Sequence, residues 1–585
     1  MRMRKTKPWI AAGMAAVMLC GCGTPTSTAP SSESAGAAGG TDASADAVSE
    51  YPDYLNLDSQ RPIVKDGEKI TLSVLVQQPT NSFDDINEHW FVKFLEEEMN
   101  VDLEIEELSG EALSERKSLM FASDDLPDMM LNIGLSANDI MKYGVADEQL
   151  LPMSDYVNET LTPNIVAALE GQDKAVADAT APDGKMYTIP RFDPSYPGYG
   201  DTTGLQRCFI DTNYMEAAGF EKSPETLDEF IDMLRAIKQL NPADFGVDEI
   251  YPFVATVGRE REVIRNAFGW IGGDPVSPAW DAQEKNVTIP CADEKYADFL
   301  EVMNTMYTEG LIHPDFLTMD VMTARALYAE GKVAVLADSA PYVSRPQDFQ
   351  NYIALTPLSS NWCEEGVVQM SPAYYMYGWY DVYISANTEY PELCMRLLDY
   401  LYSPEGSVYA RDGVPEGSED SLGMIDGFTV DENGIVQYLD VENGNFESYV
   451  TYHDGIGMGI DGRVPCLLTQ QEMCGYENPG YPGEEDLDLT NGDQNYRYLC
   501  YEAHKDHMVA GLPSAMYMDE ETSARYSDLA TVIGNYVNEE SAKFIVGQRS
   551  LDEVDQFFEE LQDLGIEEYE EIVQNAYADF VAENQ

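Results

Sequence analysis

The stretch ITLSVLVQQPTNSFDDINEHWFVKFLEEEMNVDLEI, residues 70–105, decides the fold of this chain. Its first residues, 70–76, are apolar and rich in β-branched side chains, which predicts a strand. Large apolar side chains then recur at helical spacing at Trp90, Phe91, Phe94, Leu95 and Met99. Residues 101–105 are extended again, so the unit is strand, helix, strand.

The same order continues along the chain. A helical stretch precedes residues 122–125, and residues 129–131 form another apolar strand. Further on, Thr226 and Glu229 form a capping box in front of an amphipathic helix, and residues 333–336 are a strand candidate. Strands that alternate with helices imply a mostly parallel sheet with helices on both faces, so the fold class is α/β.

The first residues have the pattern of an export signal. Arg2, Arg4, Lys5 and Lys7 precede an apolar run over residues 9–19, which is shorter than the about 20 residues that span a bilayer. The run ends in Leu-Cys-Gly-Cys at residues 19–22. We therefore expect residues 1–21 to be a lipoprotein signal peptide and Cys22 to be lipidated, which anchors the protein to the outer face of the cell membrane. The alternative is an ordinary signal peptide, with Cys22 uninvolved.

Residues 22–65 are expected to be a lipidated, flexible tether. Residues 23 to about 50 consist largely of Ser, Thr, Ala, Gly and Pro, which bury too little apolar surface to fold. The remaining chain is long enough for more than one hydrophobic core. We expect it to be a monomer.

The net charge of −71 excludes some partners. Removal of the four basic residues of the signal makes the chain more acidic still, so it repels nucleic acid and anionic lipid headgroups. The content of 44% hydrophobic and 11% aromatic residues nevertheless predicts a packed body with an acidic surface.

Short stretches in a fixed order carry a family resemblance. They are ASDDLPD at 122–128, DGKMYTIPR at 183–191, SPETLDEF at 223–230, GLIHPD at 310–315 and KFIVG at 543–547. The chain resembles the extracellular solute-binding lipoproteins of carbohydrate ABC importers, in the long subgroup of the maltose-binding-protein-like family 1.

The resemblance implies a type II periplasmic-binding-protein-like fold, with two α/β lobes and a ligand cleft between them. It assigns residues 66–190 and 356–411 to the N-terminal lobe, and residues 191–355 and 412–585 to a C-terminal lobe with hairpin insertions and terminal helices. The chain would cross between the lobes at residues 187–192 and return at 354–358.

An aromatic stretch follows the expected return. Sugar rings stack on Trp and Tyr, and their hydroxyl groups pair with planar polar side chains. The candidates for ligand binding there are Tyr375, Tyr377, Trp379, Tyr380 and Asp381. The alternative is that alternate members, such as Tyr375 and Tyr377, face the core of a strand.

Four further ligand-binding candidates stand apart from this stretch. Asn132 follows a predicted strand, where parallel sheets present ligand groups, and Arg191 lies on the first crossing. Trp270 and Trp362 are candidate stacking platforms. For each of these residues a structural role is the alternative.

No cofactor is expected. In some relatives an acidic loop binds Ca²⁺, and residues 241–250 match its place. Phe245 and Val247 occupy positions where oxygen ligands are required, so a Ca²⁺ site is possible there but not favoured. Cys500, His504 and His507 share one helical face, but a packing role is favoured over a metal site.

The resemblance implies that the protein captures an oligosaccharide or a related glycan and delivers it to the permease subunits of an ABC importer. It is not expected to be an enzyme, because no catalytic motif other than abundant carboxylates is present. Two alternatives stay open. One is a surface glycan- or peptide-binding lipoprotein without a transporter, and the other is a glycosidase that uses two carboxylates.

Overall fold

The computed structural model describes residues 51–65, 67, 69–77, 85–192, 206–255, 259–272, 274–370, 374–375, 381–430, 436–439, 489–490, 492–513 and 515–583. Cys22 and the signal segment lie outside these residues. Within the unit Tyr51–Gln585, two main sheets each have their own hydrophobic core. None of the described helices combines the length and the apolar character that a membrane span requires.

The first sheet has the strand order β14-β3-β1-β2. Its strands are β1 (Ile70–Gln77), β2 (Val101–Leu108), β3 (Met129–Leu131) and β14 (Val382–Ile384). Strand β1 runs parallel to both β2 and β3, while β14 is antiparallel to β3. The strands predicted at residues 70–76, 101–105 and 129–131 are confirmed.

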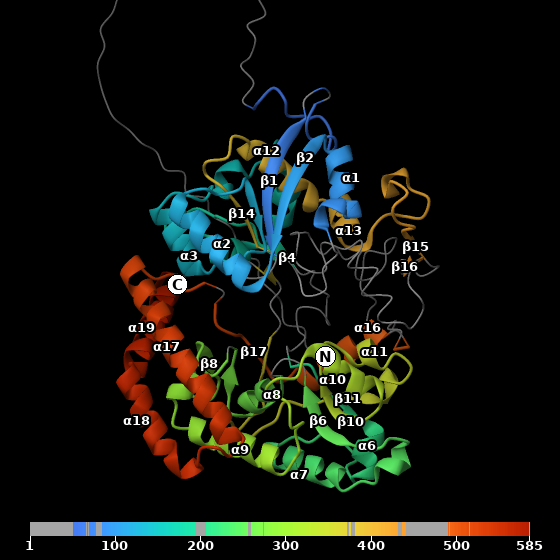
Figure 1. Cartoon of the computed structure of the whole chain (residues 1–585), viewed down its shortest axis with the longest axis vertical. Helices are drawn as coiled ribbons and strands as arrows, with labels where there is room; N and C mark the ends of the chain where they lie inside the picture. Colours follow the sequence, from blue (N-terminus) through green and yellow to red (C-terminus); the bar gives the residue numbers. More distant parts are fainter. Residues whose placement is uncertain are drawn as a thin grey trace, which may run out of the picture. The chain divides into compact units, whose positions relative to one another are not determined.

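Helices cover both faces of the first sheet (Figure 1). They are α1 (Trp90–Glu98), α2 (Gly110–Ser123), α12 (Pro391–Leu401) and α13 (Pro404–Asp412). Val74 packs on one face with Phe94 of α1 and Leu398 of α12. Leu75 packs on the other face with Met120 of α2. This alternation is the period of two that a strand buried on both faces requires.

The segment before the first sheet belongs to its core, so the predicted tether of residues 22–65 extends too far. Leu55 is 2% exposed, and Ile63 and Val64 are fully buried in the same cluster as β1. Arg61 adds ion pairs to Glu98, at 2.7 Å, and to Asp420. Apolar side chains among turn residues were too sparse to signal this packing.

The second sheet has the order β11-β5-β10-β6. Its strands are β5 (Cys208–Asp211), β6 (Tyr251–Ala255), β10 (Val333–Ala337) and β11 (Tyr352–Ala354). Strand β10 is parallel to β6, whereas β5 is antiparallel to both β10 and β11. The sheet is therefore mixed. Its faces are covered by α7 (Leu227–Lys238), α9 (Tyr296–Thr308), α10 (Val321–Ala329) and α16 (Gly492–His504).

Helix α7 begins where the sequence predicts. The Thr226 hydroxyl oxygen accepts from the backbone N–H of Glu229 at 3.1 Å. The second half of the predicted capping box differs, because the Glu229 carboxylate accepts from the backbone N–H of Glu225.

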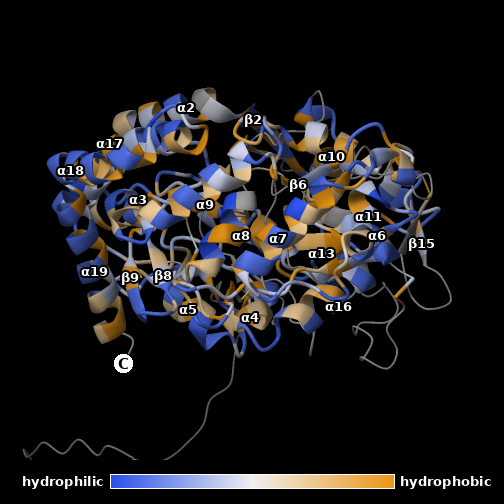
Figure 2. Ribbon diagram, turned by 90° about the horizontal axis from the view of Figure 1, so that it is seen from below, coloured by the Kyte–Doolittle hydropathy of each residue, from blue (hydrophilic) through white to orange (hydrophobic). Residues whose placement is uncertain are grey.

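The C-terminal helices pack on the second core. They are α17 (Glu520–Ile545), α18 (Val554–Leu564) and α19 (Ile566–Glu583), with α17 against α9. Hydrophilic and hydrophobic residues alternate along these outer helices in Figure 2, as expected for amphipathic helices that cover a core. A small sheet beside them contains β7 (Trp270–Ile271), β8 (Ala279–Asp281) and β9 (Asn286–Thr288).

Shorter elements complete the described structure. They are α3 (Ala137–Asp139), α4 (Pro163–Leu169), α5 (Asp173–Ala179), α6 (Thr212–Ala217), α8 (Arg259–Ala267), α11 (Pro341–Ser344), β12 (Val368–Gln369), β15 (Phe428–Val430), β16 (Val436–Tyr438) and β17 (Met508–Val509).

Two short strands mark where the chain passes between the two sheets. Strand β4 (Arg191–Phe192) pairs antiparallel with β13 (Tyr374–Tyr375). The first crossing lies within the predicted segment. The return was predicted at residues 354–358, but Leu355 and Leu358 are buried in the second core and Val367 packs with Ile271 of β7, so the return lies after residue 367.

The start of the last segment also needs a correction. Residues 412–585 were assigned to the C-terminal lobe, but Val414 and Phe428 are buried in the first core. The backbone N–H of Phe428, the first residue of β15, donates to the carbonyl of Val414 at 2.9 Å. Residues 414 and 428 therefore belong to the first lobe.

Candidate ligand-binding site

Asn132 and Asp381 lie side by side at one edge of the first sheet. Asn132 follows β3, and Asp381 precedes the antiparallel strand β14, in which Val382 is the register partner of Leu131. The backbone N–H of Asn132 donates to the carbonyl of Asp381 over 2.7 Å. This edge contains the carboxyl ends of the parallel strands, where open α/β sheets bind their ligands.

The Asp381 carboxylate holds the turn that carries Asn132. Its Oδ2 accepts from the backbone N–H of Leu135 at 3.2 Å. Asn132 has φ = 53°, a left-handed conformation that Asn tolerates better than most residues. Both side chains are buried, at 8% and 1% exposure. Asp381 therefore lies at this edge of the sheet and also stabilises the turn after β3.

The crossing strands place Arg191 opposite Tyr375. These residues are register partners in the β4–β13 pair, and the Arg191 side chain is buried. The hydroxyl of Tyr402, the residue that follows α12, donates to the carbonyl groups of Ile189, at 3.1 Å, and Pro190, at 2.9 Å. The crossing is thus fixed to the first lobe at its start. Tyr377, Trp379 and Tyr380 lie outside the described residues and stay predictions.

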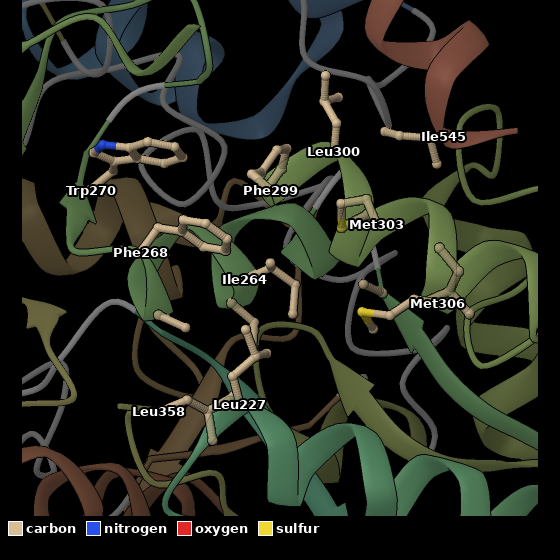
Figure 3. Close-up of a cluster of buried hydrophobic side chains, with 14 of the residues drawn as sticks. Leu227, Ile264, Phe268, Trp270, Phe299, Leu300, Met303, Met306, Leu358 and Ile545 are labelled. Carbon is tan, nitrogen blue, oxygen red and sulfur yellow. The ribbon is translucent and has the colours of Figure 1, made fainter. Parts of the chain in front are cut away.

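Trp270 and Trp362 occupy packing positions in the second lobe. Trp270 is 1% exposed and packs on Phe268, with 5.3 Å between ring centroids (Figure 3). Trp362 stacks on Phe268 at 4.2 Å, and its indole N–H donates to Asp298 at 2.8 Å. The predicted role of Trp270 as a stacking platform is corrected, because its burial leaves no ring face for a sugar.

The corresponding edge of the second sheet carries residues that the sequence did not single out. Cys208 is the register partner of Ala337, so the amino end of β5 lies at the carboxyl end of β10. Gln206 comes just before this strand. Its Oε1 accepts from Nδ2 of Asn266, in α8, at 3.0 Å. Helix α8 itself follows the carboxyl end of β6.

Arginines gather around this edge. Burial raises the pKa of the Glu262 carboxyl, and the guanidinium groups of Arg259, Arg265 and Arg207 act in the opposite direction. The Arg207 guanidinium also lies over the ring of Tyr496 at 5.6 Å. The sequence contained a signal, because α8 holds several arginines in a chain with 105 acidic and only 34 basic residues.

A surface depression of about 590 Å³ lies elsewhere on the first lobe, beside the edge strand β2. Its lining includes Arg116, which is ion-paired with Glu106 at 3.1 Å, and Asn87. The Asn87 amide accepts from the N–H of Ile105 and donates to its carbonyl, so it covers the open edge of β2. This depression is separate from the candidate site at the sheet ends.

Several of the residues considered for metals contact protein groups. Asp248 pairs with Lys332 at 2.9 Å, and Phe245 stacks on Tyr214. Nδ1 of His507 lies 2.8 Å from the carbonyl of Gly366. Among the residues that the structure describes, no group of three or more His, Cys, Asp or Glu side chains is arranged to hold a metal ion.

The architecture defines a class of protein. Two α/β lobes are connected by paired crossing strands, and polar side chains stand at the edge of each sheet where its parallel strands end. This is the type II fold of solute-binding proteins.

The sequence comparison identifies the family. The chain belongs to the bacterial extracellular solute-binding protein family, which it matches over residues 78–408. It is 25% identical over 255 residues to the fructooligosaccharide ABC transporter substrate-binding protein FusA of Streptococcus pneumoniae serotype 4, covering 43% of this chain and 47% of FusA. It is 24% identical over 358 residues to lipoprotein LipO of Bacillus subtilis strain 168, covering 59% of each. The chain therefore spans about half of the length of these relatives.

Solved structures show the same fold. The HMO-binding, ABC-transporter-associated solute-binding protein from Bifidobacterium longum infantis superposes with a TM-score of 0.67 and 19% identity, over 88% of this chain and 99% of that one. FusA in complex with kestose gives a TM-score of 0.67 and 20% identity, over 88% and 100% of the two chains.

Proposed function

We propose that this protein is a receptor that captures an oligosaccharide or a related glycan and delivers it to an ABC importer. The observation that carries this proposal is the β4–β13 pair, which joins two lobes whose ligand-presenting edges carry Asn132 and Asp381 on one side and Gln206 on the other. The names of FusA and of the HMO-binding protein support a glycan as ligand.

Closure is the expected mechanism. A ligand that contacts both lobes favours the closed form by its differential affinity, and the permease recognises that form. The short strands β4 and β13 are suited to absorb the change in backbone direction, because each contains only two residues. We propose that binding occurs without turnover of the glycan and requires no cofactor.

The membrane attachment belongs to the same proposal. Lipidation of Cys22 would hold a monomeric receptor at the outer face of the membrane, where its effective concentration near the permease is high. The name of lipoprotein LipO supports this placement. Mass spectrometry of the membrane fraction tests it, since a Cys22→Ala variant should lose the acyl mass and appear in the medium.

Thermal-shift screening with glycans tests the function. A bound glycan at 100 times its Kd should stabilise the folded protein by about 2.7 kcal/mol. A peptide library serves as the competing ligand class. Stabilisation by peptides and by no glycan would contradict the proposal, and release of shortened sugars would indicate a glycosidase instead.

A further inference from the structure

Gln206 has a buried hydrogen-bond donor for which the described part of the chain provides no acceptor. Its side chain is 1% exposed, and its Oε1 already accepts from Asn266. Among the residues that the structure describes, its Nε2 has no hydrogen-bond partner. A buried N–H group without an acceptor is unfavourable, and such groups in native proteins require an explanation. An oxygen atom of a ligand at this edge of the second sheet would provide the missing acceptor.

The charges beside Gln206 are predominantly positive. Arg207 is its neighbour in the chain, and Arg265 is the neighbour of Asn266. Arg259 acts on the same carboxyl group, that of Glu262, as these two arginines. Burial disfavours the charged forms of both groups, since it raises the pKa of Glu262 and lowers the pKa of Arg265. Arg261 and Asp274 also act on Arg265. Among the described groups that influence Glu262 and Arg265, the arginines therefore outnumber the acidic side chains.

A second pair of groups extends the positive region along α16. The guanidinium of Arg497 lies over the ring of Tyr496 at 5.2 Å, and that of Arg207 lies over the same ring at 5.6 Å. Tyr496 is buried in the core of the second sheet. Its aromatic face thus holds both cations near the end of β5.

The Gln206 and arginine side chains at this edge offer hydrogen-bond donors to a ligand. Arg has N–H donors only, and the unused atom of Gln206 is also a donor. Neutral sugar hydroxyl groups require both kinds of partner, whereas carboxylate and sulfate groups accept only. The planar guanidinium group fits both anions through paired hydrogen bonds. In a chain with a net charge of −71, long-range repulsion would otherwise disfavour an anionic ligand.

We propose that the ligand is an anionic glycan whose carboxylate or sulfate groups bind at Gln206, Arg207, Arg259 and Arg265. This inference rests on the proposed function and names its ligand class. Gln206 and Asn266 act as a pair, since the Asn266 amide orients the Gln206 side chain so that its N–H group points away from Asn266.

Isothermal titration of the chain from Gly23 to Gln585 tests the inference. The probes are galacturonic acid oligomers, the same oligomers with their carboxyl groups reduced to alcohols, chondroitin sulfate tetrasaccharides and neutral fructooligosaccharides. The variants are Arg259→Gln, on the half-buried first residue of α8, and Gln206→Glu, which replaces the donor by an acceptor of the same shape. Arg235→Gln is the matched control, because Arg235 pairs with Glu309 on the surface of α7.

We expect at least one acidic probe to bind at least tenfold more tightly than the neutral probes. The galacturonic and chondroitin probes separate carboxylate from sulfate recognition. Arg259→Gln and Gln206→Glu should each weaken binding at least tenfold, while Arg235→Gln should leave it unchanged. The inference is overturned if only the neutral probes bind, or if the parent protein and Arg259→Gln bind the acidic probe equally well. Either result leaves the proposed function standing. Absence of binding by every glycan overturns both. If Gln206→Glu fails to fold, Arg259→Gln still decides.

Discussion

The backbone N–H of Asn132 and the carbonyl of Asp381 are joined at 2.7 Å, although these residues lie on opposite sides of the first crossing in the sequence. The Asp381 carboxylate then accepts from the N–H of Leu135. Asp381→Ala should remove this acceptor and destabilise the fold by about 1.5–3 kcal/mol. Glycan affinity should fall as well, because the turn that carries Asn132 loses its support.

A control separates these two effects. Asp139→Ala breaks the capping box between Asp139 and Ser136 in the same region of the chain. It should destabilise the protein by about 1 kcal/mol without changing glycan affinity. Equal affinities for Asp381→Ala and Asp139→Ala would remove Asp381 from the candidate site. Urea unfolding and calorimetry provide the two measurements.

The aromatic stack in the second lobe predicts stability effects without binding effects. Trp270→Ala should cost about 3–5 kcal/mol, because the side chain is buried against Phe268 and Phe299. Trp362→Phe keeps the stack on Phe268 but loses the hydrogen bond to Asp298, at a cost of about 1 kcal/mol. A large loss of glycan affinity in a folded Trp362→Phe protein would contradict this prediction and show that Trp362 contributes to ligand binding.

The start of the folded body predicts a boundary for truncation. Removal of residues 23–50 should leave the unfolding free energy unchanged. Extending the deletion through residue 65 removes Leu55, Ile63 and Val64 from the first core, and the stability should fall by several kcal/mol, since each buried aliphatic side chain contributes about 2 kcal/mol. Equal unfolding free energies for the two deletion variants would show that residues 51–65 do not stabilise the first core.

Much of the fold could be predicted from local patterns. Strand β1 has apolar side chains on both faces, and α7 has a cap at Thr226, so both are visible in the sequence. The pairing of β4 with β13 was not predictable, because strands of two residues have no periodicity and their partners are far apart in sequence. Leu355 and Leu358 likewise look like a continuing strand, but their burial in the second core depends on tertiary contacts.

The candidate site likewise contains residues that could be predicted from the sequence and residues that could not. Asn132 could be predicted because strand ends in a parallel sheet are recognisable from the apolar run before them. Trp270 could not be excluded, since an aromatic residue before a glycine has the same local pattern whether it is buried or exposed. Gln206 was missed because its importance depends on Asn266, whose amide reaches it only in the folded chain.

His504 predicts a dependence of stability on pH. Burial lowers the pKa of this fully buried side chain from 6.5 to about 4. In the unfolded chain the His504 imidazole therefore becomes protonated below pH 6.5, whereas in the folded chain it stays neutral down to about pH 4. Stability from the neutral imidazole is present above pH 6.5 and is lost as the pH falls, at about 1.4 kcal/mol per pH unit.

Urea unfolding at pH 7 and pH 5 measures this effect. His504→Gln should reduce the difference in unfolding free energy between the two pH values by about 2 kcal/mol relative to the parent protein. His507→Gln is the control, since Nδ1 of His507 contacts a backbone carbonyl and its ring is only partly buried. Parallel pH profiles for the parent protein and His504→Gln would contradict the prediction.

Small-angle X-ray scattering with and without a saturating glycan tests the central claim, that two lobes capture a glycan by closing on it. The glycan is the one that gives the largest thermal shift in the screen, and chromatography of the same samples monitors its integrity. The account predicts a smaller radius of gyration with bound glycan and an intact sugar after incubation. An unchanged radius of gyration at saturation, or cleavage of the sugar, would contradict it.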